Sequence, residues 1–244
     1  MQKNLDLNNT LIDFNQVSKE IADQCILHEI SLSFKKGEFV CLLGESGSGK
    51  TTLLNIVNGL IKEDSGTVSV MGKIGMAFQN GALLPWLSVY ENIELPLLSL
   101  GIEKEEQKKK VDEAISLVGL AEFKDTLPRF LSGGQRQRVG IARALAYGAD
   151  ILLLDEPFSA LDIKTSSELE NDLLSLWKET ELTIIMVSHN INEAVSLASR
   201  VVIIENGIVK ENREQKAPYP RDMSSSENVM LSKDIKDIFM KMKH

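Results

Sequence analysis

The chain has 244 residues, of which 43% are hydrophobic and 25% are charged, a composition typical of one globular α/β unit rather than a disordered or fibrous protein. Its formal net charge of −8 lacks the basic excess that binding to nucleic-acid backbones usually shows, so no nucleic-acid partner is expected. No apolar run approaches the length of a membrane-spanning helix, so any role at a membrane is predicted to be peripheral.

The amino terminus and the two cysteines favour a cytoplasmic protein. Residues 1–10 are rich in Asn and Asp, without the basic start and apolar stretch of a secretory signal. Cys41 lies inside the apolar run Phe39–Leu43, where a buried, reduced thiol is expected. A disulfide between Cys41 and Cys25 is therefore not expected.

Short apolar runs alternate with helical patterns along the chain, which predicts a parallel sheet with crossover helices. A helix is expected after Lys50, and it should end at Asn58-Gly59, a pair suited to the left-handed residue beyond a helix end. The predicted strands are Glu38–Leu43, Lys73–Phe78, Asp150–Leu154, Thr183–Val187 and Arg200–Ile204.

Between Gly81 and Gly119 the strand pattern gives way to helical spacing, which predicts a helical subdomain of about residues 82–147 inserted in the α/β core. The apolar residues at helical spacing are Val111, Ala114, Ile115 and Val118.

The carboxyl terminus is predicted to form a linker followed by a helix. Residues 217–226 are rich in Pro and Ser, as linkers often are. Beyond them, one helical face would carry Leu231, Ile235, Ile238 and Phe239. This face predicts either contact with a partner or packing against the chain itself, and the second role is the more common.

The first motif with clear chemistry is Gly44-Glu45-Ser46-Gly47-Ser48-Gly49-Lys50-Thr51, which matches the pattern G-x-x-x-x-G-K-[ST] between a strand and a helix. In such a loop the backbone N–H groups and the positive helix end surround phosphate oxygens. We expect Lys50 to reach the β- and γ-phosphates of ATP and Thr51 to ligate Mg²⁺, with Thr52 also in the nucleotide site. The alternative, a chance glycine turn, does not explain the position of the motif.

A second motif, Asp155-Glu156, follows the apolar strand Ile151–Leu154. Both carboxylates then emerge at the carboxyl end of the strand, where α/β sheets bind ligands. We expect Asp155 to hold Mg²⁺ through water and Glu156 to orient or deprotonate the water that attacks the γ-phosphate. The alternative interpretation is that the acidic pair caps a helix.

The third motif, Leu131-Ser132-Gly133-Gly134-Gln135, precedes a helical stretch over residues 136–146. Together with the first two motifs, it makes the chain resemble the ATP-binding subunits of ABC transporters. The resemblance implies a P-loop NTPase (RecA-like) α/β core with an antiparallel β subdomain and an inserted α-helical subdomain. It also implies one ABC ATPase domain over residues 1–216, followed by the linker and helix of residues 217–244.

The resemblance spans about residues 11–212 and includes three further landmarks, Gln79, the segment Ser159-Ala160-Leu161-Asp162 and His189. By this resemblance, Gln79 contacts Mg²⁺ and the attacking water, His189 bonds the γ-phosphate, and Asp162 lies across a dimer interface.

The resemblance also assigns a nucleotide to the third motif. Ser132, Gly133, Gly134 and Gln135 would bind the γ-phosphate of an ATP molecule held by the opposite subunit, through a hydroxyl, glycine amides and a helix dipole. A head-to-tail homodimer with two ATP molecules between its halves follows.

The segment Gln79–Asn92, with the pair Pro85-Trp86, resembles the importer branch for nitrate, sulfonates, taurine and related small substrates, and the tail Pro218–Asp222 resembles the same branch. A Trp in this position would otherwise be read as a core residue. The branch implies an ATPase at the cytoplasmic face of the membrane, bound to transmembrane permease subunits and served indirectly by an extracytoplasmic solute-binding protein. The alternatives are a soluble ABC-type ATPase with a mechanical or regulatory role and, more distantly, a P-loop kinase.

Two departures from the family pattern bear on function. Gln79 follows Lys50 at a shorter separation than in most relatives, which predicts a trimmed β-hairpin beneath the nucleotide. Ile21 stands where the family usually places an aromatic residue to stack on adenine, which predicts weak base selectivity unless another ring, such as that of Phe14, takes over.

Overall fold

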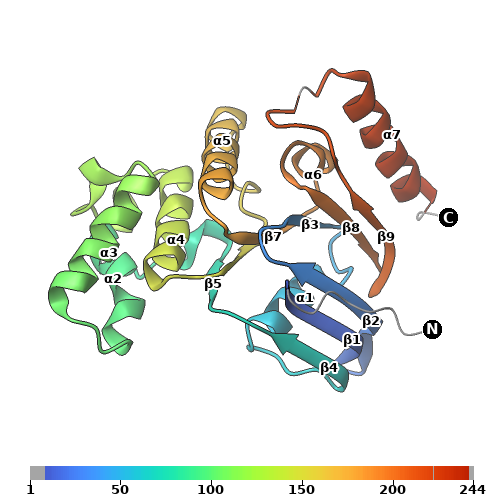
Figure 1. Ribbon diagram of the computed structural model, residues 1–244, viewed down its shortest axis with the longest axis horizontal. Coiled ribbons are helices and arrows are strands. Elements are labelled where there is room, and N and C mark those ends of the chain that lie inside the picture. The colour runs from blue at the N-terminus through green and yellow to red at the C-terminus, as the bar shows by residue number, and fades with distance from the viewer. Residues whose placement is uncertain (1–8, 222, 242–244) are drawn as a thin grey trace. The chain divides into compact units, whose positions relative to one another are not determined.

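Figure 1 shows the protein as a computed structural model, which describes residues 9–221 and 223–241. The described chain divides into two compact units. The first unit contains residues 9–71 and 185–241, and the second contains Gly72–Ile184. All five predicted strands are present, and their ends lie within one residue of the predicted ends.

The first unit contains an antiparallel sheet made of β1 (Thr10–Ile21), β2 (Gln24–Lys35) and β4 (Ser65–Val70), in the order β2-β1-β4. Alternating apolar side chains give this sheet one buried face. There the rings of Phe14 and Phe34 meet edge to face, with centroids 6.3 Å apart. The predicted antiparallel β subdomain is confirmed.

The core sheet of the first unit has the order β7-β3-β8-β9, in which β7 (Thr183–Ser188) enters from the second unit. β3 (Phe39–Leu43) lies parallel to β8 (Arg200–Glu205), and β9 (Ile208–Glu214) returns antiparallel to β8. Every residue of β3 is buried, as expected for a strand covered on both faces.

Three helices complete the first unit: α1 (Lys50–Val57), α6 (Ile191–Leu197) and α7 (Ser226–Lys241). α1 ends as predicted, since Gly59 takes the left-handed conformation with φ of 71°. Cys41 and Cys25 are both free thiols, and Cys41 is buried. Burial raises the pKa of the Cys41 thiol far above its usual range, because the charged thiolate is poorly solvated there.

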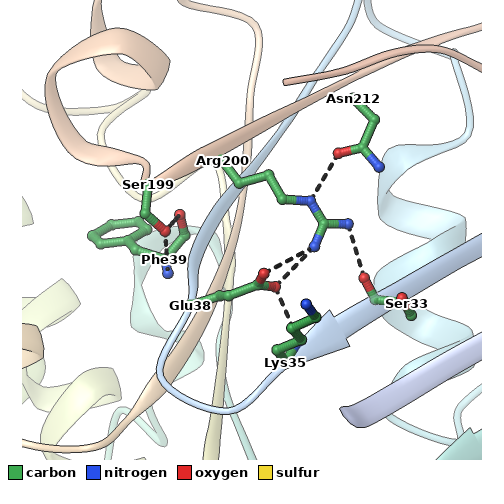
Figure 2. A network of polar contacts seen from close by, with 7 residues as sticks. All are labelled: Ser33, Lys35, Glu38, Phe39, Ser199, Arg200 and Asn212. Atoms are coloured by element: carbon green, nitrogen blue, oxygen red, sulfur yellow. Dashed lines mark hydrogen bonds and ion pairs between the residues drawn. The ribbon is translucent and has the colours of Figure 1, made fainter. Parts of the chain in front are cut away.

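A buried arginine ties the antiparallel sheet to the core strands inside the first unit (Figure 2). The Arg200 guanidinium donates to both carboxylate oxygens of Glu38, at 2.9 and 3.1 Å, and to the Ser33 carbonyl at 2.8 Å. Its Nε donates to the Asn212 side chain at 2.8 Å. Because the charge is matched by several oxygen partners, its burial is compensated.

The second unit has the strand order β5-β6-β7, with β5 (Ile74–Ala77) parallel to β6 (Ile151–Asp155). α4 packs against α2, α3 and β5. Val111, Ala114, Ile115 and Val118 are buried, in agreement with their predicted helical face. The helical elements of this unit are η1 (Gln79–Ala82), α2 (Val89–Glu94), η2 (Leu95–Ser99), α3 (Lys104–Leu117), η3 (Ala121–Phe123), η4 (Pro128–Phe130), α4 (Gly133–Tyr147) and α5 (Ile163–Glu179).

The predicted carboxyl-terminal helix is α7, and it packs against α6 within the first unit (Figure 1). Ile235 is buried at this contact and Ile238 is half-buried, while the side chain of Phe239 lies outside the described residues. The helix therefore covers its own chain. The proposed domain boundary at residue 216 stays a prediction. Within the described ranges, none of the helices has the length and apolar character that crossing a membrane requires.

Candidate active site

The phosphate loop, Gly44–Thr51, runs from β3 into the first turn of α1. The Lys50 side chain is buried beneath the loop, where its ammonium donates to the carbonyl oxygens of Gly44 at 2.8 Å and Glu45 at 2.6 Å. These two carbonyls hold the Lys50 ammonium in place beneath the loop. Thr51 is exposed and Thr52 half-buried in the same turn of α1.

Glycine is required in the phosphate loop because neighbouring backbone comes very close. A Cβ at Gly49, whose φ is 101°, would lie 3.0 Å from the Ile26 carbonyl oxygen and 2.7 Å from a Leu27 methyl carbon. The loop is also tied to the β8–β9 hairpin, since the Gly207 N–H donates to the Ser48 carbonyl at 3.1 Å. A small hollow of about 140 Å³ lies between the loop and this hairpin.

His189 belongs to the same unit as the phosphate loop. It follows β7, the neighbour of β3 in the core sheet, and it is exposed just before α6 begins. Its side chain lines a hollow of about 720 Å³ whose far wall is α7, with Lys233 and Lys236. The hollow is therefore bordered by cationic groups.

The acidic pair Asp155-Glu156 belongs to the second unit, at the end of β6. Glu156 has a φ of 45°, a left-handed conformation that is uncommon for a residue with a side chain and that concentrates at functional sites. The turn is closed by Ser159, whose hydroxyl donates to the Glu156 carbonyl at 3.0 Å. The next helix, α5, is capped by Asp162, so the helix-cap interpretation of Asp155-Glu156 is wrong.

Asp162 accepts hydrogen bonds from the Thr165 backbone N–H at 3.1 Å and the Thr165 hydroxyl at 2.7 Å. These bonds stabilise the charged carboxylate and lower the pKa of Asp162. Its predicted place across a dimer interface stays a prediction.

The signature turn, Leu131–Gln135, forms the amino-terminal end of α4 in the second unit. The Ser132 hydroxyl accepts from the Gln135 N–H at 3.2 Å, and the Gln135 side chain accepts from the Ser132 N–H at 2.8 Å, a complete capping box. Gly133 and Gly134 pack against the Asp162 turn: a Cβ at Gly134 would overlap a Thr165 methyl group. The two glycines therefore allow these turns to meet, and Ser132 remains exposed.

Gln79 begins η1, and its side chain lies outside the described residues. The backbone after it is held by α4, because the Arg143 guanidinium donates to the carbonyls of Gly81 at 2.9 Å and Ala82 at 3.1 Å. Burial lowers the pKa of Arg143. Arg143 is not among the residues predicted from the sequence, although its place on the mainly apolar side of α4 was a usable signal.

The loop with Pro85-Trp86 is built around Asn92, a second residue that was not predicted from the sequence. Asn92 is fully buried; its amide donates to the Leu87 and Ser88 carbonyls, both at 2.9 Å, and its oxygen accepts from the Leu84 N–H at 2.8 Å. Trp86 is 70% exposed on this loop, so the core-packing alternative for Trp86 is wrong.

At the predicted base-contacting position, Ile21 is 43% exposed at the end of β1. Phe14 is buried in the antiparallel sheet against Phe34 and presents no free ring face to a ligand. The alternative that Phe14 stacks on adenine is therefore wrong.

A glycine-rich phosphate loop between a strand and a helix, together with an acidic pair after a second strand, defines the class of P-loop nucleoside triphosphatases. The signature turn narrows the class. The chain belongs to the ABC transporter family, whose profile matches residues 27–159, and it is an ABC-type ATPase.

Curated relatives agree with this assignment. The chain is 40% identical over 208 residues to the aliphatic sulfonates import ATP-binding protein SsuB 1 of Paracoccus denitrificans, covering 84% of each chain. It is 44% identical over 191 residues to the nitrate import ATP-binding protein NrtD of Synechococcus elongatus, covering 74% of this chain and 70% of the relative.

Among solved structures, the chain is similar to the dimeric post-hydrolysis state of the ATP-binding cassette MJ0796 bound to ADP and Pi. The TM-score is 0.75 with 34% identity, over 85% of this chain and 100% of the other. The α/β fold with an antiparallel sheet and an inserted helical region is thus shared with ABC ATPases.

Proposed function

We propose that this chain is the ATP-hydrolysing subunit of an importer for a small substrate such as nitrate, a sulfonate or a related organic compound. The observation that carries the proposal is the presence, on one chain, of a phosphate loop and an exposed Ser132 at a second helix terminus. The phosphate loop is enough to hold the phosphates of the chain's own nucleotide. The signature turn would then bind the nucleotide that a second copy of the chain holds. Names of relatives that import sulfonates and nitrate support the substrate class.

The two copies would close head to tail around two ATP molecules, with Lys50 of one subunit and Ser132 of the other at each site. The dimeric state of the MJ0796 cassette supports this arrangement. Lys50 would exchange the Gly44 and Glu45 carbonyls for phosphate oxygens, and the loop N–H groups would bind the same phosphates.

The oxygen donors of Thr51, Asp155 and Gln79 fit Mg²⁺, a hard cation that prefers hydroxyl, carboxylate and amide oxygens and shares its shell with phosphates. When bound, the ion neutralises phosphate charge. Glu156 would orient the attacking water, and its left-handed backbone, a conformation that concentrates at functional sites, supports this role. His189 bonds the γ-phosphate. Hydrolysis removes the group that bridges the two subunits, so binding and cleavage alternate closed and open dimers.

The membrane partner would be a pair of transmembrane permease subunits, with this chain peripheral at the cytoplasmic face. The exposed Trp86 on a loop held rigidly by Asn92 supports such a contact, because a large exposed aromatic side chain is typical of interaction surfaces. An extracytoplasmic solute-binding protein would act indirectly, through the permease.

The test is co-purification from native membranes with the permease subunits, followed by measurement of ATP hydrolysis stimulated by the assembled complex. We expect the chain in the membrane fraction and a Trp86→Ala variant that hydrolyses ATP but binds the permease more weakly. A chain found only with ribosomes or DNA would support the alternative of a soluble ABC-type ATPase.

A further inference from the structure

The His189 turn, defined here as Ser188–Asn190, is held on both sides by one carboxylate of α6. Glu193 accepts a hydrogen bond of 2.5 Å from the Ser188 hydroxyl and one of 3.0 Å from the Asn190 side-chain amide. The Ser188 hydroxyl also accepts from the Asn190 N–H at 2.9 Å. The two neighbours of His189 therefore share one anchor.

Helix α6, which carries Glu193, is fixed at its other end by Arg221. One guanidinium nitrogen of Arg221 donates to the Val195 carbonyl at 2.8 Å and to the Ala198 carbonyl at 2.6 Å, and the side chain is buried. A cation that donates to the last carbonyls of a helix also interacts favourably with the negative end of its dipole. Since α6 has only 7 residues, it depends on such tertiary contacts.

Two further side chains close the same end of α6. The Gln215 amide donates to the Ala194 carbonyl at 3.1 Å and the Tyr219 hydroxyl donates to the Leu197 carbonyl at 2.8 Å. Arg221 stacks on the Tyr219 ring, 4.1 Å from its centroid. Burial raises the pKa of Tyr219 to about 12, so its hydroxyl keeps the proton that it donates.

We infer that Glu193 and Arg221 are positioning residues for His189: Glu193 fixes the His189 turn to α6, and Arg221 fixes α6 within the first unit. This inference rests on the proposed role of His189 at the γ-phosphate. It also assigns a role to the described residues 218–221, because they bring Tyr219 and Arg221 to α6. Holding a catalytic group in place matters because a misplacement of about 1 Å can cost on the order of 10²-fold in rate.

The test is a double-mutant cycle on the full chain, with steady-state ATP hydrolysis measured for Glu193→Gln, His189→Ala and the double variant. The Gln amide replaces one acceptor oxygen with a donor, so one of the two contacts to the His189 turn is lost. We expect kcat to fall about ten-fold while KM for ATP stays within about two-fold. Adding Glu193→Gln to His189→Ala should cause no further loss; independent, multiplying losses would overturn the inference.

Arg221 is tested in the same way. Arg221→Gln should lower kcat by several-fold without changing KM, and Arg221→Lys, which keeps the charge, should recover part of the loss. The matched control is Arg213→Gln, since Arg213 is a half-exposed arginine of β9 that pairs with Asp234. A control as slow as Arg221→Gln would overturn the role of Arg221.

A readout independent of turnover follows the His189 ring by NMR. The chain has 3 histidines, so the ring signal of His189 is assigned by its loss in His189→Ala. Glu193→Gln should shift this signal, whereas Glu211→Gln, in β9 of the same unit, should not. An unmoved His189 signal in a folded Glu193→Gln variant would overturn the inference.

A different experimental result would contradict the proposed function. A wild-type chain found only with ribosomes or DNA would contradict the proposed importer function alone, and the His189 signal would still test the anchoring by Glu193. If the His189→Ala variant hydrolyses ATP at the wild-type rate, His189 has no role in catalysis. Glu193 and Arg221 then cannot act as positioning residues for it.

Discussion

The two helix termini proposed to bind phosphate, at the starts of α1 and α4, are built in opposite ways. α1 begins after Gly49, and no side chain caps its amino-terminal end. α4 begins after Ser132, and its first turn is closed by a complete capping box with Gln135. Glycine and serine lie at or just before the start of both helices, yet only the terminus of α4 is capped by its own side chains.

This difference agrees with the different roles proposed for the two termini. The start of α1 has no side-chain cap and the buried Lys50 lies at its first position, as expected if this terminus binds phosphate. At α4, the Ser132 hydroxyl accepts a hydrogen bond from the Gln135 N–H, and this cap stabilises the helix end within one chain.

The largest expected effect comes from a variant that separates ATP binding at the starts of α1 and α4 from ATP hydrolysis. Glu156→Gln should keep ATP bound but lower turnover by a factor of about 10² or more, because the water-orienting carboxylate is lost while the phosphate loop is intact. The variant should also form a more stable dimer with ATP, detected by size-exclusion chromatography. Glu168→Gln, an exposed glutamate of α5, is the control and should hydrolyse ATP normally. Near-normal turnover in Glu156→Gln would show that another carboxylate orients the water.

A mixed dimer tests whether the uncapped and capped termini act on the same nucleotide. Chains with Lys50→Ala and chains with Ser132→Arg should each be inactive, but their heterodimer keeps one composite site free of both lesions. Nucleotide trapping in the mixture should recover one of the two sites. Trapping no higher than in either parent would contradict the head-to-tail arrangement.

A smaller effect checks the capping difference itself, in the absence of nucleotide. Ser132→Ala should lower the free energy of unfolding by about 1 kcal/mol, the usual cost of losing a side-chain cap. Ser46→Ala in the phosphate loop should change it by less than about 0.5 kcal/mol, because exposed positions without such a contact are usually neutral. Equal losses by urea denaturation would remove the contrast between the two termini.

The smallest effect concerns the base rather than the phosphates. An aliphatic Ile21 lacks the ring face that makes base stacking worth about 1–3 kcal/mol in nucleic-acid systems. Ile21→Tyr should therefore tighten ATP binding by about several-fold, if about 1 kcal/mol of stacking is realised. The wild type should discriminate poorly between ATP and GTP, and Ile21→Leu is the matched control. If titration calorimetry shows the same affinity for ATP in Ile21→Tyr as in the wild type, the adenine base does not bind at residue 21.

The strands and the phosphate loop were predictable from the sequence because their signals are local. A run such as Ile151–Leu154 is continuous in hydrophobicity since both faces of the strand are covered. The end of α1 followed from Asn58-Gly59, and the capping box of α4 is encoded by a serine and a glutamine three residues apart.

The rest could not be predicted because it depends on contacts between distant segments. Arg143 and Asn92 hold loops through backbone carbonyls, and a sequence pattern does not show which carbonyls need a donor. Trp86 looked like a core residue because burial is the usual fate of an aromatic ring, and the structure exposes it. The boundaries between the two units, at Gly72 and Ile185, are also not accompanied by a change in amino-acid composition.

The burial of Cys41 has a practical consequence for experiments on nucleotide binding. Thiol reagents need an accessible thiolate, which the buried Cys41 does not offer, whereas Cys25 is exposed at the start of β2. The residue after Cys25, Ile26, has its carbonyl beside Gly49 of the phosphate loop. We therefore expect a maleimide fluorophore to label Cys25 without mutagenesis, next in sequence to a residue that contacts the phosphate loop, where its emission would report the arrival of ATP.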